Sequence, residues 1–254
     1  MRPIATSKYL SIADDLRQQI IAGRLPPGAR FPTLAEIQEQ YEVAEGTAYQ
    51  ATRVLLNEGL IVTKPGAQTR VRERPEAIRM VRSWYRESRV GSPWHADMAA
   101  QGRVGSWDAR TVEENAPPAI AERLLVMPGD AVTCTSYVYK TDGKPTSLAT
   151  SWEPLAITRN TPIELPDGGE YRWHGLVERM AVIGIKVTSV VEEIVPRPLT
   201  VTEARQLDLR QGIPIIVIER TYFAGERPVE TANLVIAPTY RPRYEIPIRG
   251  VDEE

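Results

Sequence analysis

Cysteine, histidine and long apolar runs are scarce in this chain of 254 residues. Its single cysteine, Cys134, excludes a disulfide framework within the chain. Its two histidines, His95 and His174, stand far apart, and no metal-ligand spacing is present. No apolar run reaches the roughly 18 residues of a membrane span, and Met1–Ala5 lacks the apolar core of a secretory signal. We therefore expect a cytoplasmic protein with no metal, no cofactor and no membrane partner.

Signatures of common enzyme sites are missing as well. Gly168 and Gly169 stand outside any G-x-x-x-x-G-K-[ST] phosphate-binding motif. No combination of Ser, His and Asp can be argued as a catalytic triad. No catalytic residue is predicted, and an enzyme is not the expected function.

The charge divides unevenly between two parts of the chain. Residues 1–75 hold 10 Lys and Arg against 8 Asp and Glu, and the remainder holds 21 against 25. The length itself favours two domains. A net charge of about +2 on the first part is too small for strong non-specific DNA binding by a monomer, because neutralised phosphates set that affinity. A homodimer is therefore the expected DNA-binding form.

Residues 9–71 show caps, turns and apolar spacings in the order of a winged helix-turn-helix. The first helix is indicated by apolar residues at helical spacing, Tyr9, Ile12, Leu16 and Ile20, and is ended by Gly23. After a Pro26-Pro27-Gly28 turn, Thr33 and Glu36 form an S/T-x-x-E capping box that begins the second helix. A four-residue connection, 42–45, leads to a third helix whose inner side is small: Ala48, Ala51 and Leu55.

A basic hairpin is expected after the third helix. Leu60–Thr63 reads as one strand and Gln68–Arg72 as the next, with a turn at Pro65-Gly66. A third helix and a basic hairpin of this kind contact the major groove and the phosphates or minor groove of DNA. The residues expected to contact DNA are Arg30, Thr33, Glu45, Gly46, Thr47, Tyr49, Gln50, Arg53, Lys64, Gly66, Gln68, Arg70 and Arg72.

Any one of these features alone is typical of the charged surface of a small helical domain, whereas their ordered combination favours DNA binding. Residues 9–71 resemble the DNA-binding domain of the GntR family of bacterial transcription regulators. The matching residues are Gly23, Leu25, Pro27-Gly28, Phe31-Pro32, Glu36, Val43, Thr47, Ala51, Leu55, Glu58-Gly59-Leu60, Gly66, Thr69 and Val71.

Three positions depart from that resemblance. Ala35, Glu45 and Tyr49 stand where the family commonly has arginines that contact guanines. Base reading must then shift to other groups: Gln50 could read adenine, Glu45 could accept from a cytosine amine, and Tyr49 could contact a thymine methyl group or a phosphate. We expect an operator that differs from the family's commonest one.

The remaining two-thirds of the chain contains an internal repeat at an offset of 83 residues. We predict a linker at residues 76–91, a domain at 92–248 and an acidic tail at 249–254, after the DNA-binding domain at 1–75. Each copy of the repeat reads as a short helix, a Gly turn and a hairpin, with turns at Asp142-Gly143 and Gly225-Glu226. Gly175–Ile183 and Lys186–Val195 are expected to separate the copies. The predicted fold class is α+β, with one antiparallel sheet and helices packed on one of its faces.

Residues 90–248 resemble the UTRA effector-binding domain of the HutC-type branch of the GntR family, which shares the chorismate-lyase fold. The resemblance rests on Ala121-Glu122-Arg123-Leu124, Pro128-Gly129-Asp130, Ser151-Trp152-Glu153-Pro154, Arg179-Met180, Glu192, Arg220-Thr221-Tyr222 and Pro228–Ala232. It implies a small-molecule effector that changes operator affinity, and dimerisation through this domain.

The effector pocket also departs from the resemblance. Sugar-phosphate-sensing relatives have arginines where Tyr137 and Tyr139 stand and a tyrosine where Ile236 stands, so a more apolar ligand is expected here. The expected effector contacts are Tyr137, Tyr139, Ser151, Trp152, Arg220, Tyr222 and Glu230. Two alternatives remain open: the aromatic residues fill the core between sheet and helices, and Arg220 and Glu230 form a structural ion pair across adjacent strands.

The function predicted from these features is a ligand-responsive, dimeric transcription regulator, with repression as the expected sense. Its partners would be double-stranded DNA with a palindromic operator and a small-molecule effector. A constitutive DNA-binding dimer that has lost its ligand is one alternative. A lyase-like enzyme tethered to DNA is another, although fold analogy alone does not support catalysis.

Overall fold

The computed structural model describes residues 7–63, 67–73, 78–82 and 92–244. The chain divides into two compact units, Met1–Glu76 and Ala77–Glu254, called here the N-terminal and the C-terminal unit. Among the described residues, no helix has the length and apolar character to cross a membrane.

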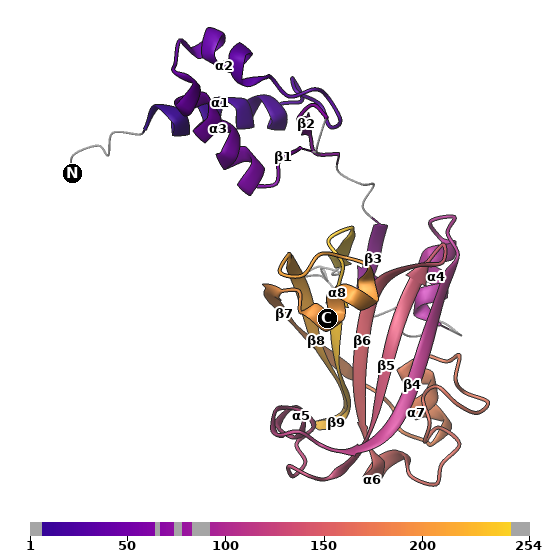
Figure 1. Ribbon diagram of the computed structural model, residues 1–254. Helices are drawn as coiled ribbons and strands as arrows, with labels where there is room; N and C mark the ends of the chain where they lie inside the picture. The colour runs from indigo at the N-terminus through magenta and orange to yellow at the C-terminus, as the bar shows by residue number, and fades with distance from the viewer. Residues whose placement is uncertain (1–6, 64–66, 74–77, 83–91, 245–254) are drawn as a thin grey trace, which may run out of the picture. The chain divides into compact units, whose positions relative to one another are not determined.

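The N-terminal unit has the predicted order of three helices followed by a hairpin (Figure 1). Its elements are α1 Lys8–Ile21, α2 Leu34–Tyr41, α3 Glu45–Asn57, β1 Ile61–Val62 and β2 Arg70–Val71, with β1 and β2 antiparallel. The side chains of Leu16, Ile37 and Leu55, one from each helix, are completely buried together. Ala48 and Ala51 are also fully buried, so small residues let α3 pack closely against its neighbours.

The start of α2 confirms the predicted capping box. Thr33 Oγ1 accepts a hydrogen bond from the Glu36 backbone N–H at 3.2 Å, and the Glu36 carboxylate accepts one from the Thr33 N–H at 2.7 Å. At the other end, Glu42 adopts a left-handed conformation with φ 50°, which turns the chain sharply toward α3. The connection is three residues rather than the predicted four, because Glu45 already belongs to α3.

Replacing Thr33 by alanine removes this cap, and Thr33→Ser is the matched control because serine keeps the hydroxyl oxygen. We expect Thr33→Ala to lower the local stability of α2 by about 1 kcal/mol, since an unsatisfied first-turn N–H costs about that much. Hydrogen exchange of the α2 amides, followed by mass spectrometry, measures the change. Equal protection in the alanine and serine variants would show that the cap contributes nothing.

The C-terminal unit is built on a six-stranded antiparallel sheet in the order β4-β5-β6-β9-β8-β7. The strands are β4 Gly105–Asn115, β5 Ala131–Thr141, β6 Lys144–Pro154, β7 Ser189–Pro198, β8 Pro214–Ala224 and β9 Arg227–Ile236. The predicted hairpin turn at Asp142-Gly143 is confirmed: both residues have positive φ, 51° and 77°, as a type I′ turn requires. Gly225, with φ 64°, lies in the turn between β8 and β9.

Helices cover both faces of this sheet, whereas the sequence predicted helices on one face. The helices of the unit are α4 Pro93–Ala99, α5 Pro118–Leu124, α6 Leu155–Thr158, α7 Leu176–Val182 and α8 Val201–Leu207. Leu148 and Val235 pack with α8, while their strand neighbours Ala149 and Leu234 pack with the side chains of α4. Because successive strand residues point to opposite faces, α4 and α8 lie on different sides of the sheet (Figure 1).

The internal repeat is longer than the sequence predicted. The offset of 83 residues relates α5 to α8, β5 to β8 and β6 to β9, and it also relates α4 to α7. The segment expected to separate the copies, 175–195, is therefore the beginning of the second copy, with α7 and β7 equivalent to α4 and β4. Each copy contributes one half of the sheet, and the halves join where β6 pairs with β9.

Part of the predicted linker is a strand. Residues Ile78–Arg82 form β3, which pairs in parallel with β10, Tyr240–Tyr244, near the end of the described chain. Met80 is buried there with Tyr240 in the same apolar cluster as Trp94 and Met98. Arg79 and Arg82 give this segment the charged composition of a linker, but its partner strand lies about 160 positions away in the sequence. Residues 83–91 of the predicted linker and the acidic tail lie outside the described residues.

Candidate nucleic-acid interface and ligand cavity

Helix α3 presents a polar face opposite its buried alanines. Tyr49 is 51% exposed, and Glu45, Gly46, Gln50 and Arg53 are exposed with it. The Arg53 guanidinium lies 6.0 Å from the centre of the Tyr49 ring, so these two side chains share one surface. Thr47, also predicted to contact DNA, is half-buried at the start of the helix. An exposed helix face carrying an arginine, an amide and a phenol has the donors and acceptors needed to contact base edges and phosphates.

Three other predicted DNA contacts have partners inside the N-terminal unit. Arg30 forms an ion pair with Glu36, and Thr33 is occupied by the capping box. Arg70 donates a hydrogen bond to the Gly28 carbonyl at 2.8 Å. The Arg70 contact joins the hairpin to the segment that precedes α2. Each guanidinium has further N–H donors besides the one used internally, so Arg30 and Arg70 can contact a phosphate while they keep these partners.

The remaining predicted contacts belong to the hairpin. Gln68 and Arg72 are exposed. Lys64 and Gly66 lie outside the described residues.

The C-terminal unit contains a partly open cavity of about 150 Å³ on the α4 and α7 side of the sheet. Six of the seven residues predicted to contact the effector line it: Tyr137, Tyr139, Ser151, Arg220, Tyr222 and Glu230. The repeat explains this gathering, because Tyr137 and Arg220 are equivalent positions, as are Tyr139 and Tyr222. Equivalent strand positions in the two halves point to the same face and converge on the cavity.

Trp152 is the exception, and its assignment to the pocket was wrong. It follows Ser151 in β6, so its side chain points to the opposite face of the sheet. There its indole N–H donates to Glu114 Oε1 at 2.8 Å, and the ring packs against the α5 cluster. Trp152 therefore packs on the side of the sheet away from the cavity.

Two ion pairs lie in the cavity wall. Arg179 of α7 contacts Glu153 of β6 through Nη1–Oε1 at 2.6 Å and Nη2–Oε2 at 3.1 Å, and it also donates to the Ile163 carbonyl at 2.6 Å. Both side chains are almost completely buried, at 5% and 2% exposure. Burial opposes the charge on Arg179, but the pKa of its guanidinium is raised because the Glu153 carboxylate favours the charged form.

The second pair joins Arg220 Nη2 to Glu230 Oε1 at 3.0 Å, with the Arg220 guanidinium 4.7 Å from the centre of the Tyr222 ring. The cross-strand ion pair that the sequence left open is therefore present, and its two members also line the cavity. The interpretation as an ion pair and the interpretation as a ligand-facing pair are compatible.

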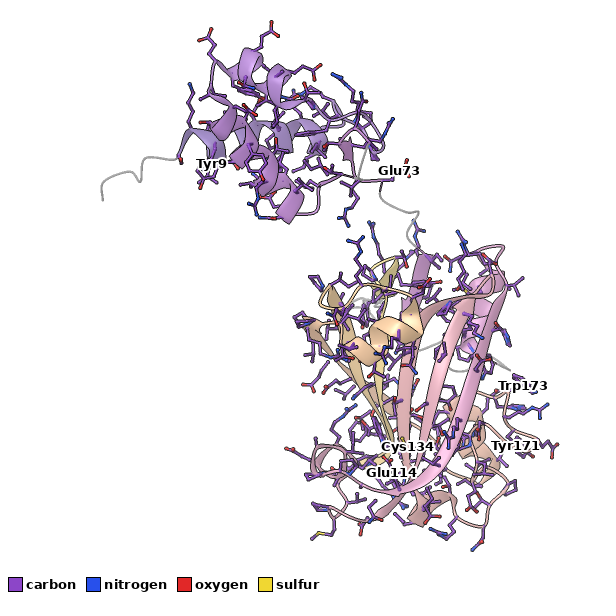
Figure 2. The ribbon with its side chains drawn as sticks, in the orientation of Figure 1. Tyr9, Glu73, Glu114, Cys134, Tyr171 and Trp173 are labelled. Carbon is purple, nitrogen blue, oxygen red and sulfur yellow. The ribbon has the colours of Figure 1, made fainter. Side chains whose placement is uncertain are left out.

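Sequence reasoning missed three tryptophans of the cavity wall. Trp94 lies 5.2 Å from the Tyr139 ring, and Trp107 lies 5.3 Å from the ring of Trp173. Figure 2 shows Trp173 with Tyr171 on the loop that leads to α7. The longer repeat relates Trp94 to Val177 and Trp107 to Val190, and these two valines also pack on this side of the sheet. The repeat could therefore have indicated that Trp94 and Trp107 face the cavity.

Strand β3 also reaches the cavity. Met80 and Arg82 line it, and Arg82 Nε donates to Glu192 Oε2 at 3.1 Å, where the Tyr244 hydroxyl donates as well at 3.1 Å. β3 is the first strand of the C-terminal unit and begins shortly after β2 in the sequence, so the start of this unit contributes directly to the cavity wall.

Cys134 lies beside Glu114 on the neighbouring strand (Figure 2). Burial and the nearby Glu114 carboxylate raise the pKa of its thiol from 9.0 to about 12. A raised pKa keeps the thiol protonated at pH 8, so we expect iodoacetamide to label the native protein much more slowly than the urea-unfolded chain. Mass spectrometry of the labelled protein gives both rates, and equal rates would contradict a half-buried thiol with a raised pKa.

An exposed helix face on a winged helix-turn-helix, together with a lined cavity in a separate unit, defines a ligand-responsive DNA-binding regulator. Comparison with known sequences agrees. Residues 8–71 match the family described as bacterial regulatory proteins, gntR family, and residues 100–240 match the UTRA domain. The chain belongs to the GntR family of bacterial transcription regulators and carries a UTRA domain.

Its relatives include two named repressors. The mannosyl-D-glycerate transport/metabolism system repressor MngR of Escherichia coli K12 is 25% identical over 223 residues, covering 87% of this chain and 88% of that protein. The histidine utilization repressor of Pseudomonas putida is 27% identical over 249 residues, covering 93% and 90%. Both relatives are named as repressors, which favours a regulator over the lyase-like alternative.

Solved structures show the same architecture. A crystal structure described as a GntR-family transcriptional regulator is 42% identical, with a TM-score of 0.86 and coverage of 96% of this chain and 99% of that one. PhnF from Mycobacterium smegmatis, at 23% identity, shares the fold with a TM-score of 0.56, covering 94% and 100%.

Proposed function

We propose that two copies of this chain bind a palindromic operator through α3 and the β1–β2 hairpin, and that a small molecule in the C-terminal cavity weakens this binding. The DNA contacts proposed for α3 are those of Glu45, Tyr49, Gln50 and Arg53, whose side chains are exposed on one face. Dimerisation is supported by charge: about +2 on the N-terminal unit gives one copy few phosphate contacts, and affinity depends on their number.

The observation that carries the ligand-response proposal is the position of β3. This strand lines the cavity through Met80 and Arg82, and only a short segment separates it from β2. A ligand that displaces Met80 or the Arg82–Glu192 pair therefore shifts the attachment point of the N-terminal unit. Two DNA-binding units read a palindrome only when their spacing matches the helical repeat of the duplex, so a shift of a few ångströms lowers operator affinity.

The test begins with selection of genomic fragments by the purified full-length protein, followed by sequencing and footprinting. We expect one enriched inverted repeat with half-site centres one helical turn, or a whole number of turns, apart, and two chains for each operator in sedimentation experiments. A single unrepeated half-site bound by one chain would contradict the dimeric part of the proposal. An operator complex that no cavity-binding molecule weakens would favour a regulator that has lost its ligand response.

A further inference from the structure

We infer that the cavity ligand is a monoanion carrying a single aromatic ring, in the class of arylacetates and benzoates. This inference rests on the proposed function of the cavity as the effector site and adds the chemistry of the effector. It draws on three independent properties of the wall: size, aromatic surface and charge.

The size suits one ring. The cavity measures about 150 Å³, and an apolar cavity of about that volume in another protein holds one benzene molecule. The polar part of a larger ligand would have to extend toward the open side, where Arg172 and Trp173 are exposed.

The wall offers aromatic faces to such a ring. Tyr137 and Tyr139 lie nearly parallel, with ring centres 5.7 Å apart and planes 14° apart. Trp107 lies 6.2 Å from Tyr139 on the same wall. Aromatic rings stack or pack edge-to-face at 4.5–7 Å, so a ligand ring adds to an existing aromatic cluster.

The charge of the wall selects an anion. Four arginines line the cavity, and three of them pair with carboxylates: Arg82 with Glu192, Arg179 with Glu153 and Arg220 with Glu230. For the fourth, Arg172, the contact found among the described residues is with the Trp173 ring, 4.9 Å from the guanidinium carbon. One arginine without a carboxylate leaves a single positive charge for the ligand to balance, which fits a monoanion better than a phosphate dianion.

Buried polar atoms without hydrogen-bond partners also favour an anionic ligand. Within the described part of the chain, Arg179 Nε and His174 Nδ1 are buried atoms of cavity-lining residues with no hydrogen-bond partner. Arg179 Nε–H is a donor only, so its missing partner is an acceptor. Buried donors without partners cost free energy, and a carboxylate oxygen of the ligand would satisfy this one. A cationic ligand would satisfy neither this donor nor Arg172, although aromatic walls alone could accept it.

Isothermal titration calorimetry of the full-length protein with matched probes tests the inference. Phenylacetate is the one-ring monoanion. Phenylacetamide keeps the ring but is neutral, and phenethylammonium keeps the ring but is positively charged. Cyclohexylacetate keeps the negative charge but has a saturated ring. Glucose 6-phosphate represents the dianionic sugar phosphates. We expect phenylacetate to bind at least tenfold more tightly than every other probe.

Variants locate the binding. Arg172→Gln should weaken phenylacetate binding about tenfold, and Trp107→Leu should reduce its preference over cyclohexylacetate. Arg110→Gln is the matched control, because Arg110 is exposed on β4 and lies outside the cavity lining. The inference is overturned if the amide, the amine or the sugar phosphate binds more tightly than phenylacetate. It is also overturned if phenylacetate does not bind at millimolar concentration. An equal loss of phenylacetate affinity in Arg172→Gln and Arg110→Gln would overturn it as well.

The inference and the proposed function fail in different ways. Selective phenylacetate binding that leaves operator affinity unchanged would contradict the ligand response and leave the ligand class intact. An operator released by a ligand of another class would contradict the ligand class and leave the ligand response intact.

Discussion

Replacing Tyr49, Gln50 and Arg53 together by alanine is expected to lower operator affinity by roughly 100-fold or more, because each good base contact contributes about 1–3 kcal/mol. All three side chains are exposed on α3 and take no part in the core formed by Ala48, Ala51 and Leu55. The variant should therefore fold like the wild type. Fluorescence anisotropy with a labelled operator, at fixed salt concentration, measures the loss.

The matched control for this variant lies on another exposed helix face. Gln18 and Ile21 of α1 point to the surface of the same unit, and replacing them by alanine should leave operator affinity within about twofold, since these side chains are not predicted to contact DNA. The Arg53→Ala change alone should also flatten the dependence of affinity on salt if that guanidinium contacts a phosphate. Unchanged affinity and sequence preference in the triple variant would show that α3 does not read the operator.

Replacing Arg179 by methionine is expected to destabilise the C-terminal unit by about 3–5 kcal/mol, because it leaves the Glu153 carboxylate buried without its countercharge. All five tryptophans belong to this unit. Tryptophan fluorescence during urea unfolding therefore reports on its stability and not on that of the N-terminal unit.

The double variant Arg179→Met with Glu153→Leu is the control. Removing both charges leaves no uncompensated ion, and we expect it to recover most of the lost stability. If the single variant lost less than about 1 kcal/mol, the buried pair would contribute little to holding α7 against the sheet.

The features that the sequence predicted correctly are those marked by patterns within a few neighbouring residues. The capping box of Thr33 and Glu36 and the turn at Asp142-Gly143 act over a few residues, and the structure confirms both. β3 carried no such signal, because its partner strand, β10, lies at the opposite end of the C-terminal unit's sequence. A parallel pairing over that separation leaves no short-range pattern.

The cavity was predictable only in part, for a related reason. Strand alternation and the repeat place Tyr137, Tyr139 and Arg220 on one face, and the same alternation places Trp152 on the face opposite Ser151. Arg172 and Trp173 come from an irregular loop, whose path depends on packing rather than on any periodic pattern. The face of α3 was predictable from helical periodicity, whereas the internal partners of Arg30 and Arg70 depend on how the hairpin packs against the segment before α2.

The most direct test of the account measures the dissociation constant of the protein for its selected operator, first without ligand and then with a saturating molecule that calorimetry shows to bind the C-terminal cavity. Coupling between two sites is a difference in binding free energy, typically a 5- to 150-fold change in affinity. We predict at least a tenfold weaker complex when the cavity is occupied. Equal dissociation constants, with ligand binding verified on the same sample, would contradict the link between cavity and operator.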